Sequence, residues 1–133
     1  MKFSTKSTYG IRAMVNLAKN SKGVSLSLAK IAEEEKISLG YLERLFSKLK
    51  KAGLVKSERG VNGGYSLTRR AEDISILDIV KTLEGDISYF RCIDEDGVVS
   101  CDSLDVCGAV KVLSRLQKAV NDTLVNFKLS ELL

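Results

Sequence analysis

Residues 37–51 have the sequence ISLGYLERLFSKLKK, and their pattern predicts a short helix with two different faces. Apolar residues recur at steps of three and four and predict a core-facing stripe. This stripe consists of Leu42, Leu45, Phe46 and Leu49. The opposite face carries groups that suit contacts with base edges and phosphates. These are Gly40, Tyr41, Glu43, Arg44, Ser47, Lys48 and Lys51. Ser38 can cap the N-terminus of the helix. Gly53 can end it in a left-handed conformation, so that Leu54 folds back on Leu49.

Two further helical patterns precede this helix. We expect a first helix over residues 3–20 and a second over residues 24–35, with a turn at Gly23 between them. Their predicted buried residues are Gly10, Ala13, Met14, Leu17, Ala18, Leu28, Ile31 and Ala32. Residues 36–38 form a tight connection to the helix quoted above. Two short helices joined in this way, the second with a polar outer face, are typical of a helix-turn-helix.

A hairpin with a glycine-rich tip is predicted directly after Gly53. Residues 54–59 (LVKSER) and 65–68 (YSLT) have strand character, and the sequence GVNGG at 60–64 joins them. Glycine and asparagine accept positive φ and let backbone amides approach a ligand. A tip flanked by Arg59 can therefore lie along a phosphate backbone or in a minor groove. A plain hairpin loop is the alternative. A nucleotide-binding phosphate loop is disfavoured, because no lysine followed by serine or threonine closes the loop and no helix follows it.

The second half of the chain begins with a helix and ends with a longer one. Ser75 and Asp78 predict a capping box for a helix over residues 75–83, which would stop near Gly85. A second stripe predicts an amphipathic helix over residues 105–127, about 34 Å long at 1.5 Å per residue. The stripe consists of Val106, Ala109, Val110, Leu113, Leu116, Ala119, Val120, Leu124 and Phe127. No other element is long enough to cover this helix, which favours a two-fold dimer. Packing of the helix against its own domain is the alternative.

Length and composition exclude several classes of protein. The chain has 133 residues, enough for one compact domain with an accessory element, and 44% of them are hydrophobic. No stretch approaches the roughly 18 consecutive apolar residues of a membrane span, and the N-terminus is polar, so we expect a cytoplasmic protein without a membrane partner. The absence of histidine removes the usual general base and the commonest nitrogen ligand of metals. We therefore do not expect an enzyme.

Charge is divided unequally along the chain. Residues 1–70 hold 15 Lys and Arg against 5 Asp and Glu, whereas residues 71–133 hold 6 against 12. The net charge of +4 at pH 7 therefore combines a half of +10 with a half of −6. This asymmetry suggests that the first half binds nucleic acid and that the second has a different task. The alternative is that the lysines only keep the helices soluble.

Three cysteines lie in the acidic stretch before the long helix: Cys92, Cys101 and Cys107. Their spacing, C-x8-C-x5-C, falls among Asp, Gly and Ser, where a hydrophobic core is not expected. Thiolates bind soft metals and iron-sulfur clusters, and an odd number of cysteines cannot all form disulfides within one chain. The spacing lacks the CxxC pairs of common zinc sites. Metal or cluster binding is favoured, and a redox thiol switch and buried structural cysteines are the alternatives.

Together, these features resemble the iron-sulfur branch of the Rrf2 (Rrf-two) family of winged-helix repressors, which includes IscR, NsrR and RirA. The resemblance lies in the start of the chain, in the segment ISLGYLERLFSKLKKAGLVKSERGVNGGYSL at residues 37–67, and in the three cysteines before a long C-terminal helix. It covers essentially the whole chain and is strongest to IscR. It implies a mainly α-helical protein with a small β-hairpin wing, which binds a pseudo-palindromic DNA operator as a homodimer.

The resemblance also assigns parts of the chain. Residues 1–84 correspond to a winged helix-turn-helix DNA-binding domain, residues 85–107 to an acidic cluster loop, and residues 105–133 to a dimerisation helix and tail. The family's DNA-contact region falls on Ser38, Tyr41, Glu43, Arg44, Ser47, Lys48, Arg59, Gly60, Asn62, Gly63 and Gly64. The three cysteines match the metal ligands, and similarity to IscR favours a [2Fe-2S] over a [4Fe-4S] cluster.

The cysteine motif departs from that of IscR in two respects. The gap between Cys92 and Cys101 is longer than in IscR and NsrR. The position one turn past the third cysteine, where IscR has a histidine ligand, is Val110, and the position where some NsrR proteins supply an aspartate is Thr8. The fourth ligand is therefore open. The candidates are a water, a small thiol, a side chain of the partner subunit, Asp94, Glu95, Asp102 and Asp105.

The expected function is that of a DNA-binding transcriptional repressor whose operator affinity follows iron-sulfur status, oxygen or nitric oxide. An alternative keeps the DNA binding and replaces the cluster with a protein partner, a small ligand, zinc or thiol oxidation.

Overall fold

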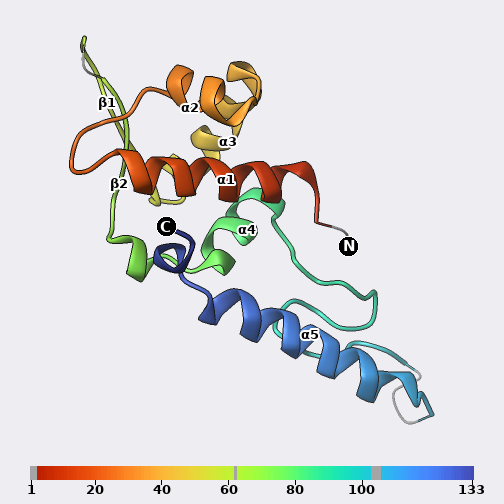
Figure 1. Cartoon of the computed structure of the whole chain (residues 1–133). Helices are drawn as coiled ribbons and strands as arrows, with labels where there is room; N and C mark the ends of the chain where they lie inside the picture. Colours follow the sequence, from red (N-terminus) through yellow and green to blue (C-terminus); the bar gives the residue numbers. More distant parts are fainter. Residues whose placement is uncertain (1–2, 62, 103–105) are drawn as a thin grey trace.

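The computed structural model of the protein describes residues 3–61, 63–102 and 106–133. These residues form mainly helices together with a two-stranded antiparallel hairpin, as the sequence predicts. The elements are α1 (Thr5–Asn20), α2 (Leu28–Glu35), α3 (Leu39–Lys51), β1 (Val55–Glu58), β2 (Gly64–Leu67), α4 (Ile76–Glu84) and α5 (Ala109–Asn126), with 3-10 turns at Ala71–Asp73 and Leu129–Leu132. In Figure 1, α1 to α4 form the body, while the hairpin and the N-terminal end of α5 project at opposite ends.

Local capping sets the ends of the helices. Each of α1 to α4 follows a serine whose hydroxyl accepts a hydrogen bond from a first-turn amide. These serines are Ser4, Ser27, Ser38 and Ser75. At the end of α3, Gly53 has a φ of +77°, and the amide of Leu54 donates to the carbonyl of Leu49 over 3.0 Å. Both the serine cap and the glycine ending predicted for α3 are thus confirmed.

The second helix is shorter than predicted. It begins at Leu28 rather than at residue 24, because Ser27 caps it and Leu26 pairs with the hairpin. Leu26 and Tyr65 exchange two backbone hydrogen bonds of 2.8 Å each, which adds a short third segment to the sheet. A Cβ on Gly64 would lie 2.3 Å from the carbonyl oxygen of Leu26, so this approach requires glycine.

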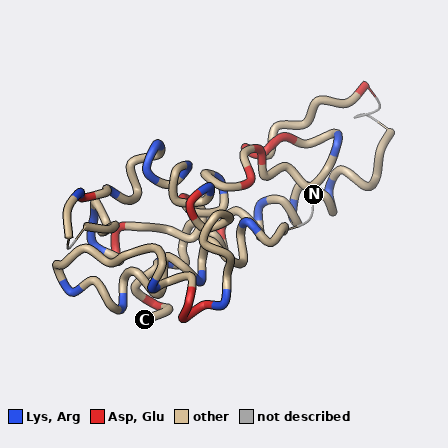
Figure 2. Tube along the Cα trace, turned by 90° about the horizontal axis from the view of Figure 1, so that it is seen from above, with Lys and Arg blue, Asp and Glu red and all other residues tan. Residues whose placement is uncertain are grey.

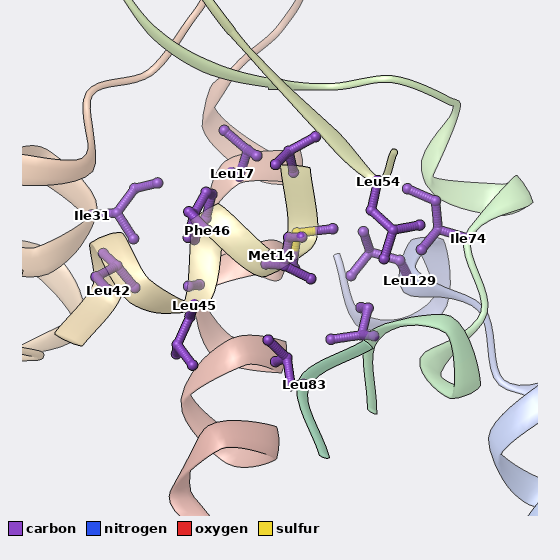
Figure 3. Packing of buried hydrophobic residues seen from close by; sticks show 14 of the residues in the cluster. Met14, Leu17, Ile31, Leu42, Leu45, Phe46, Leu54, Ile74, Leu83 and Leu129 are labelled. Atoms are coloured by element: carbon purple, nitrogen blue, oxygen red, sulfur yellow. The ribbon is translucent and has the colours of Figure 1, made fainter. Parts of the chain in front are cut away.

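The core lies between α1 to α4 and the base of the hairpin. Figure 3 shows apolar side chains from these elements packed around Met14 and Phe46, both fully buried. The apolar stripes predicted for the first three helices face this core. Phe46 also packs edge-to-face on Tyr65, with ring centroids 5.1 Å apart, which ties the hairpin to α3. The hairpin and α3 are therefore held in one unit.

The last helix begins later than predicted. It starts at Ala109, directly after Gly108, and its 18 residues span about 27 Å. The predicted first residue, Asp105, lies outside the described residues. Val106 comes before the helix and is exposed, so the predicted stripe does not extend to it.

The C-terminal part of α5 packs back on the body of the molecule. Leu124 is buried in the core, and Leu129, which follows the helix, is fully buried. The amide of Leu129 donates to the carbonyl of Ile74, and the amide of Ile76 donates to that of Phe127, each over 2.9 Å. The expectation that no part of the chain covers this helix is therefore wrong for its C-terminal part.

A neighbouring face of α5 stays uncovered. Val112 is 59% exposed and Leu116 is 49% exposed, although both are apolar. A shallow apolar groove runs along this face, and its lining consists of Phe3, Leu116, Ala119, Val120, Thr123 and Leu124. The apolar stripe predicted from the sequence is therefore divided. Leu124 faces the core, whereas Leu116 faces solvent.

Candidate nucleic-acid interface and cysteine segment

The exposed face of α3 carries four of the predicted DNA-contact residues. These are Glu43, Arg44, Ser47 and Lys48, and the predicted contact Ser38, which caps the helix, is exposed as well. Because the other face of α3 is locked in the core, these groups project from a rigid helix. Among the described residues, no ion pair involves Arg44 or Lys48. Both cations are therefore available to a polyanion.

Tyr41 differs from its neighbours on this helix. It is half-buried and packs edge-to-face on Tyr9 of α1, with ring centroids 5.9 Å apart. Its hydroxyl lies 3.1 Å from the Oγ1 atom of Thr5. The sequence places Tyr41 on the free face, whereas the structure makes it a contact between α3 and the N-terminus of α1.

The wing between β1 and β2 has a narrow, exposed tip. Arg59 and Gly60 are exposed, and Val61 beside them is fully exposed. The amide of Gly63 donates to the carbonyl of Gly60 over 2.9 Å, and a Cβ on Gly63 would lie 2.6 Å from the carbonyl oxygen of Glu58. The glycine at 63 therefore permits the tight return of the chain. The predicted contact Asn62 lies outside the described residues.

A carboxylate from α4 caps the start of α1. The Oε1 atom of Glu84 accepts hydrogen bonds from the amide of Ser4 over 3.0 Å, from its hydroxyl over 2.5 Å, and from the hydroxyl of Ser7 over 2.7 Å. Burial raises the pKa of Glu84, but the hydrogen bonds from the two serines outweigh this effect, so the net pKa lies below the ordinary value of 4.5. No local pattern in the sequence predicts this contact, because its partners are about 80 residues apart.

We use the name cysteine segment for residues 85–107, which connect α4 to α5. Two amide side chains of α5 hold its first part. Gln117 accepts from the amide of Tyr89 over 3.1 Å, and Asn121 donates to the carbonyl of Glu95 over 2.8 Å. Glu95 also forms an ion pair with Lys81 of α4 at 2.9 Å, and this hydrogen bond raises the pKa of Lys81. Gln117 lies among the apolar positions of α5, a periodic signal by which sequence analysis could have identified it.

The three cysteines are free thiols of intermediate exposure. The carbonyl of Cys92 accepts from the amide of Ser100 over 2.9 Å, which sets the backbone of Cys101 close to that of Cys92. Cys107 lies at the other end, two residues before α5. Across residues 3–61, 63–102 and 106–133, no three cysteine, aspartate or glutamate side chains converge on a point that could hold a metal. Thiol sulfur is a suitable ligand for a soft metal, but this structure does not bring the three cysteine side chains together at one point.

Two of the candidate fourth ligands already have partners. The Oδ1 atom of Asp94 accepts from the amides of Asp96 and Val98, over 3.0 and 2.8 Å, and so stabilises a turn. Glu95 is paired with Lys81, whereas Asp102 is exposed. The candidate Asp105 lies outside the described residues.

The charge asymmetry of the sequence is visible in three dimensions. Figure 2 shows basic residues spread over the helical body, where acidic residues also lie, and a further group of acidic residues along the cysteine segment. In the part of the chain that is described, no helix combines the length and the apolar character that a membrane span requires.

Comparison with known proteins identifies the family. The model of the Rrf2 family, described as an iron-dependent transcriptional regulator, matches residues 3–133. The HTH-type transcriptional regulator IscR of Pectobacterium atrosepticum is 36% identical over 132 residues, which cover 99% of this chain and 79% of that protein.

Solved structures agree with this assignment. CymR, the global cysteine regulator of B. subtilis, is similar with a TM-score of 0.82 at 36% identity, covering 99% of this chain and 95% of that one. IscR of T. potens is similar with a TM-score of 0.77 at 36% identity, covering 98% of this chain and 85% of that one. These relatives are transcriptional regulators and not enzymes. The chain belongs to the Rrf2 family of winged-helix, DNA-binding transcriptional regulators.

Proposed function

We propose that the protein is a homodimeric repressor that binds a pseudo-palindromic operator and whose affinity is set by an iron-sulfur cluster on Cys92, Cys101 and Cys107. In this proposal, residues 1–84 bind DNA, residues 85–107 hold the cluster, and residues 105–133 form the dimer helix and tail. The proposed DNA contacts are Ser38, Tyr41, Glu43, Arg44, Ser47, Lys48, Arg59, Asn62 and Gly63.

The observation that carries the DNA-binding part is the exposed polar face of α3. This face presents Arg44 and Lys48 from a helix whose opposite side is buried in the core. A second helix of a helix-turn-helix enters the major groove, where such groups meet base edges and phosphates. The exposed Arg59 at the wing suits the adjacent backbone or minor groove.

The uncovered face of α5 supports the homodimer. Val112 and Leu116 are apolar, exposed and continuous with the groove beside Phe3. The same face of a second copy has the same composition, and a two-fold axis would place the two helices against each other. Such a dimer would present two α3 helices to successive half-sites of DNA.

Three free thiols in one segment support the cluster, as does the description of the family as iron-dependent. When bound, an iron-sulfur cluster of either the [2Fe-2S] or the [4Fe-4S] type would supply sensitivity to iron, oxygen or nitric oxide. A ligand shared by all three thiols requires the cysteine segment to bring Cys92, Cys101 and Cys107 closer together than they are in this structure. A coupling of about 1–3 kcal/mol between this change and DNA binding corresponds to a 5- to 150-fold change in affinity.

The test is a visible absorption spectrum with iron and sulfide analysis on protein purified without oxygen. Wild-type protein should be coloured and contain both elements, and a variant with Cys92→Ala, Cys101→Ala and Cys107→Ala should lose both. Ser100→Ala, next to Cys101, is the matched control and should keep the colour. A colourless, iron-free wild-type protein would refute the cluster and leave the DNA-binding regulator in place.

A cluster-free mode of control is the second candidate. It is favoured by the separation of the three thiols among the described residues and by the similarity to CymR, described as a regulator of cysteine. In this case zinc, thiol oxidation, a small ligand or a protein partner sets the affinity for DNA. Iron-free protein whose operator binding responds to oxidant and not to iron would support thiol oxidation.

A further inference from the structure

The turn between α2 and α3 departs from two local preferences of the chain. The last turn of α2 contains Glu33, Glu34 and Glu35 and no basic residue, although the carboxyl end of a helix dipole favours cations. Lys36, which follows, has a φ of +55°, a left-handed conformation that costs free energy in a residue with a Cβ atom. Contacts from another element are therefore needed to stabilise this turn.

Helix α1 supplies these contacts from one stripe of its surface. Arg12 donates from its Nε atom to the Oε2 atom of Glu35 over 3.1 Å, and from an Nη atom to the backbone carbonyl of the same residue. Asn16, one turn further along α1 and buried, donates from its Nδ2 atom to Glu34 over 2.9 Å and to Glu35 over 3.0 Å. The guanidinium thus brings to the end of α2 the cation that its own last turn lacks.

The same guanidinium is also linked to α3. It lies over the ring of Tyr9, with the Cζ atom 5.4 Å from the ring centroid, and Tyr9 packs edge-to-face on Tyr41 of α3 with centroids 5.9 Å apart. Only three residues separate the end of α2 from the start of α3. One side chain of α1 therefore contacts the end of α2 directly and the start of α3 through Tyr9, so it fixes both sides of the turn.

We propose that Arg12 is a positioning residue for DNA recognition, which sets the angle at which α3 meets base edges. This inference rests on the proposed entry of α3 into DNA and adds a residue that lies outside the proposed contacts. Hydrogen bonds to base edges require side chains placed to within about half an ångström, whereas attraction to phosphates depends mainly on charge. Loss of the Arg12 geometry should therefore weaken binding to the operator much more than binding to DNA of random sequence.

The test compares the full-length protein with the variant Arg12→Lys. Lysine keeps the positive charge but loses the planar fork that donates to the carbonyl and the carboxylate of Glu35 together. Lys19→Arg is the control, because it makes the reverse exchange at an exposed position of the same helix that has no ion pair among the described residues. Fluorescence anisotropy measures affinity for an operator selected by the wild-type protein from a random duplex library, and for a random duplex of equal length.

The ratio of operator affinity to random-duplex affinity should fall about fivefold or more in Arg12→Lys and stay constant in Lys19→Arg. The salt dependence of binding to the random duplex should be the same in all three proteins, because their charge is the same. The thermal midpoint should move by less than about 3 °C, since Arg12 is 47% exposed and exposed ion pairs add little stability. A loss of specificity without a loss of stability would separate positioning from a merely structural role.

A wild-type affinity ratio in Arg12→Lys would overturn the proposal. An equal fall in affinity for both duplexes would also overturn it, because Arg12 would then be a phosphate contact. If Arg12→Lys does not fold, Glu35→Ala removes the carboxylate partner of Arg12 and retains a good helix former in α2. The affinity ratio should fall in that variant too, and a constant ratio there would refute the positioning role.

Arg44→Ala, assayed beside these variants, separates this inference from the proposed function. If Arg44→Ala changes base preference while Arg12→Lys keeps the wild-type ratio, the positioning role is refuted and the contact of α3 with bases stands. If Arg44→Ala leaves base preference intact while Arg12→Lys lowers the ratio, the proposed contact of Arg44 is refuted and the positioning role of Arg12 stands.

Discussion

Arg44 and Lys48 lie one turn apart on the exposed face of α3, yet their side chains suit different targets. The planar guanidinium of Arg44 can form two parallel hydrogen bonds to a guanine edge, whereas the ammonium of Lys48 acts as a point charge towards phosphate. Removal of Arg44 should therefore affect base preference, whereas removal of Lys48 should affect affinity for DNA of any sequence.

We expect Arg44→Ala to cost about 1–3 kcal/mol on the preferred operator and to reduce discrimination among bases at one position. Lys48→Ala should weaken binding to all sequences similarly and lower the salt dependence by about one counterion. Fluorescence anisotropy on a panel of substituted operators at several salt concentrations measures both effects. Unchanged affinity and preference in Arg44→Ala would mean that α3 meets DNA through a different face.

Glu84 should make stability depend on pH in the acidic range. Because its folded-state pKa is below its ordinary value, its stabilising contribution is fully present above about pH 4.5 and is lost as pH falls through the folded-state pKa. Glu84→Gln should lower the free energy of unfolding at pH 7 by about 1 kcal/mol, because neutral acceptors form weaker hydrogen bonds. Urea denaturation at pH 7 and pH 3 should show a smaller pH-dependent loss in the variant. An identical loss in both proteins would exclude Glu84 as its source.

At the scale of elements, the sequence predicts what local contacts determine. The capping box of Ser75 with Asp78 and the glycine ending at Gly53 involve neighbours in the chain, and both are present as predicted. The start of α2 is determined by pairing of Leu26 with Tyr65, which lies 39 residues further along the chain. No periodicity within residues 24–35 contains that information.

In the candidate site too, features set by local sequence are predicted, and contacts between distant elements are not. The exposure of Arg44 and Lys48 follows from the helical period of α3, and the sequence predicts it. The contact of Tyr41 with α1 depends on how two helices cross, and so does the burial of Gln117 against the cysteine segment. Such contacts depend on packing between elements distant in the sequence. The prediction that the three cysteines bind a metal stays a prediction.

The position of the wing should depend on the glycine next to Tyr65. Gly64→Ala would place a methyl group 2.3 Å from the carbonyl of Leu26 and so break the pairing that docks the hairpin. We expect a loss of about 2 kcal/mol or more in the free energy of unfolding, measured by urea denaturation. Gly40→Ala on α3 meets no atom within 4 Å and should be neutral or stabilising by up to about 1 kcal/mol. Equal stabilities for the two variants would contradict this account of the wing.

At the scale of the whole molecule, α5 has one face in the core and another face open. Leu124 belongs to the first and Leu116 to the second. Changes to the two faces should therefore affect folding and assembly separately.

Leu116→Glu should weaken the proposed dimer by about 2–4 kcal/mol, or roughly 30- to 900-fold in Kd, because it places a charge in a closely packed apolar contact. The fold should remain, because the side chain is 49% exposed in the single chain. Sedimentation equilibrium and circular dichroism measure these two properties. Lys118→Ala, on the opposite face of α5, is the control and should leave the dimer intact. A Kd equal to that of the wild type in Leu116→Glu would place the dimer contact elsewhere.

The C-terminal tail is hydrogen-bonded to the backbone on both sides of Ser75. A rotation of α5 about this attachment would therefore resemble that of a lever. Its fulcrum is the buried Leu129, beside Ile74, and its long arm ends near Cys107. A rotation of about 10° at the fulcrum would move the far end of a helix of this length by roughly 5 Å. An angular change at the body would therefore be amplified at Cys107, which lies next to the far end of the helix.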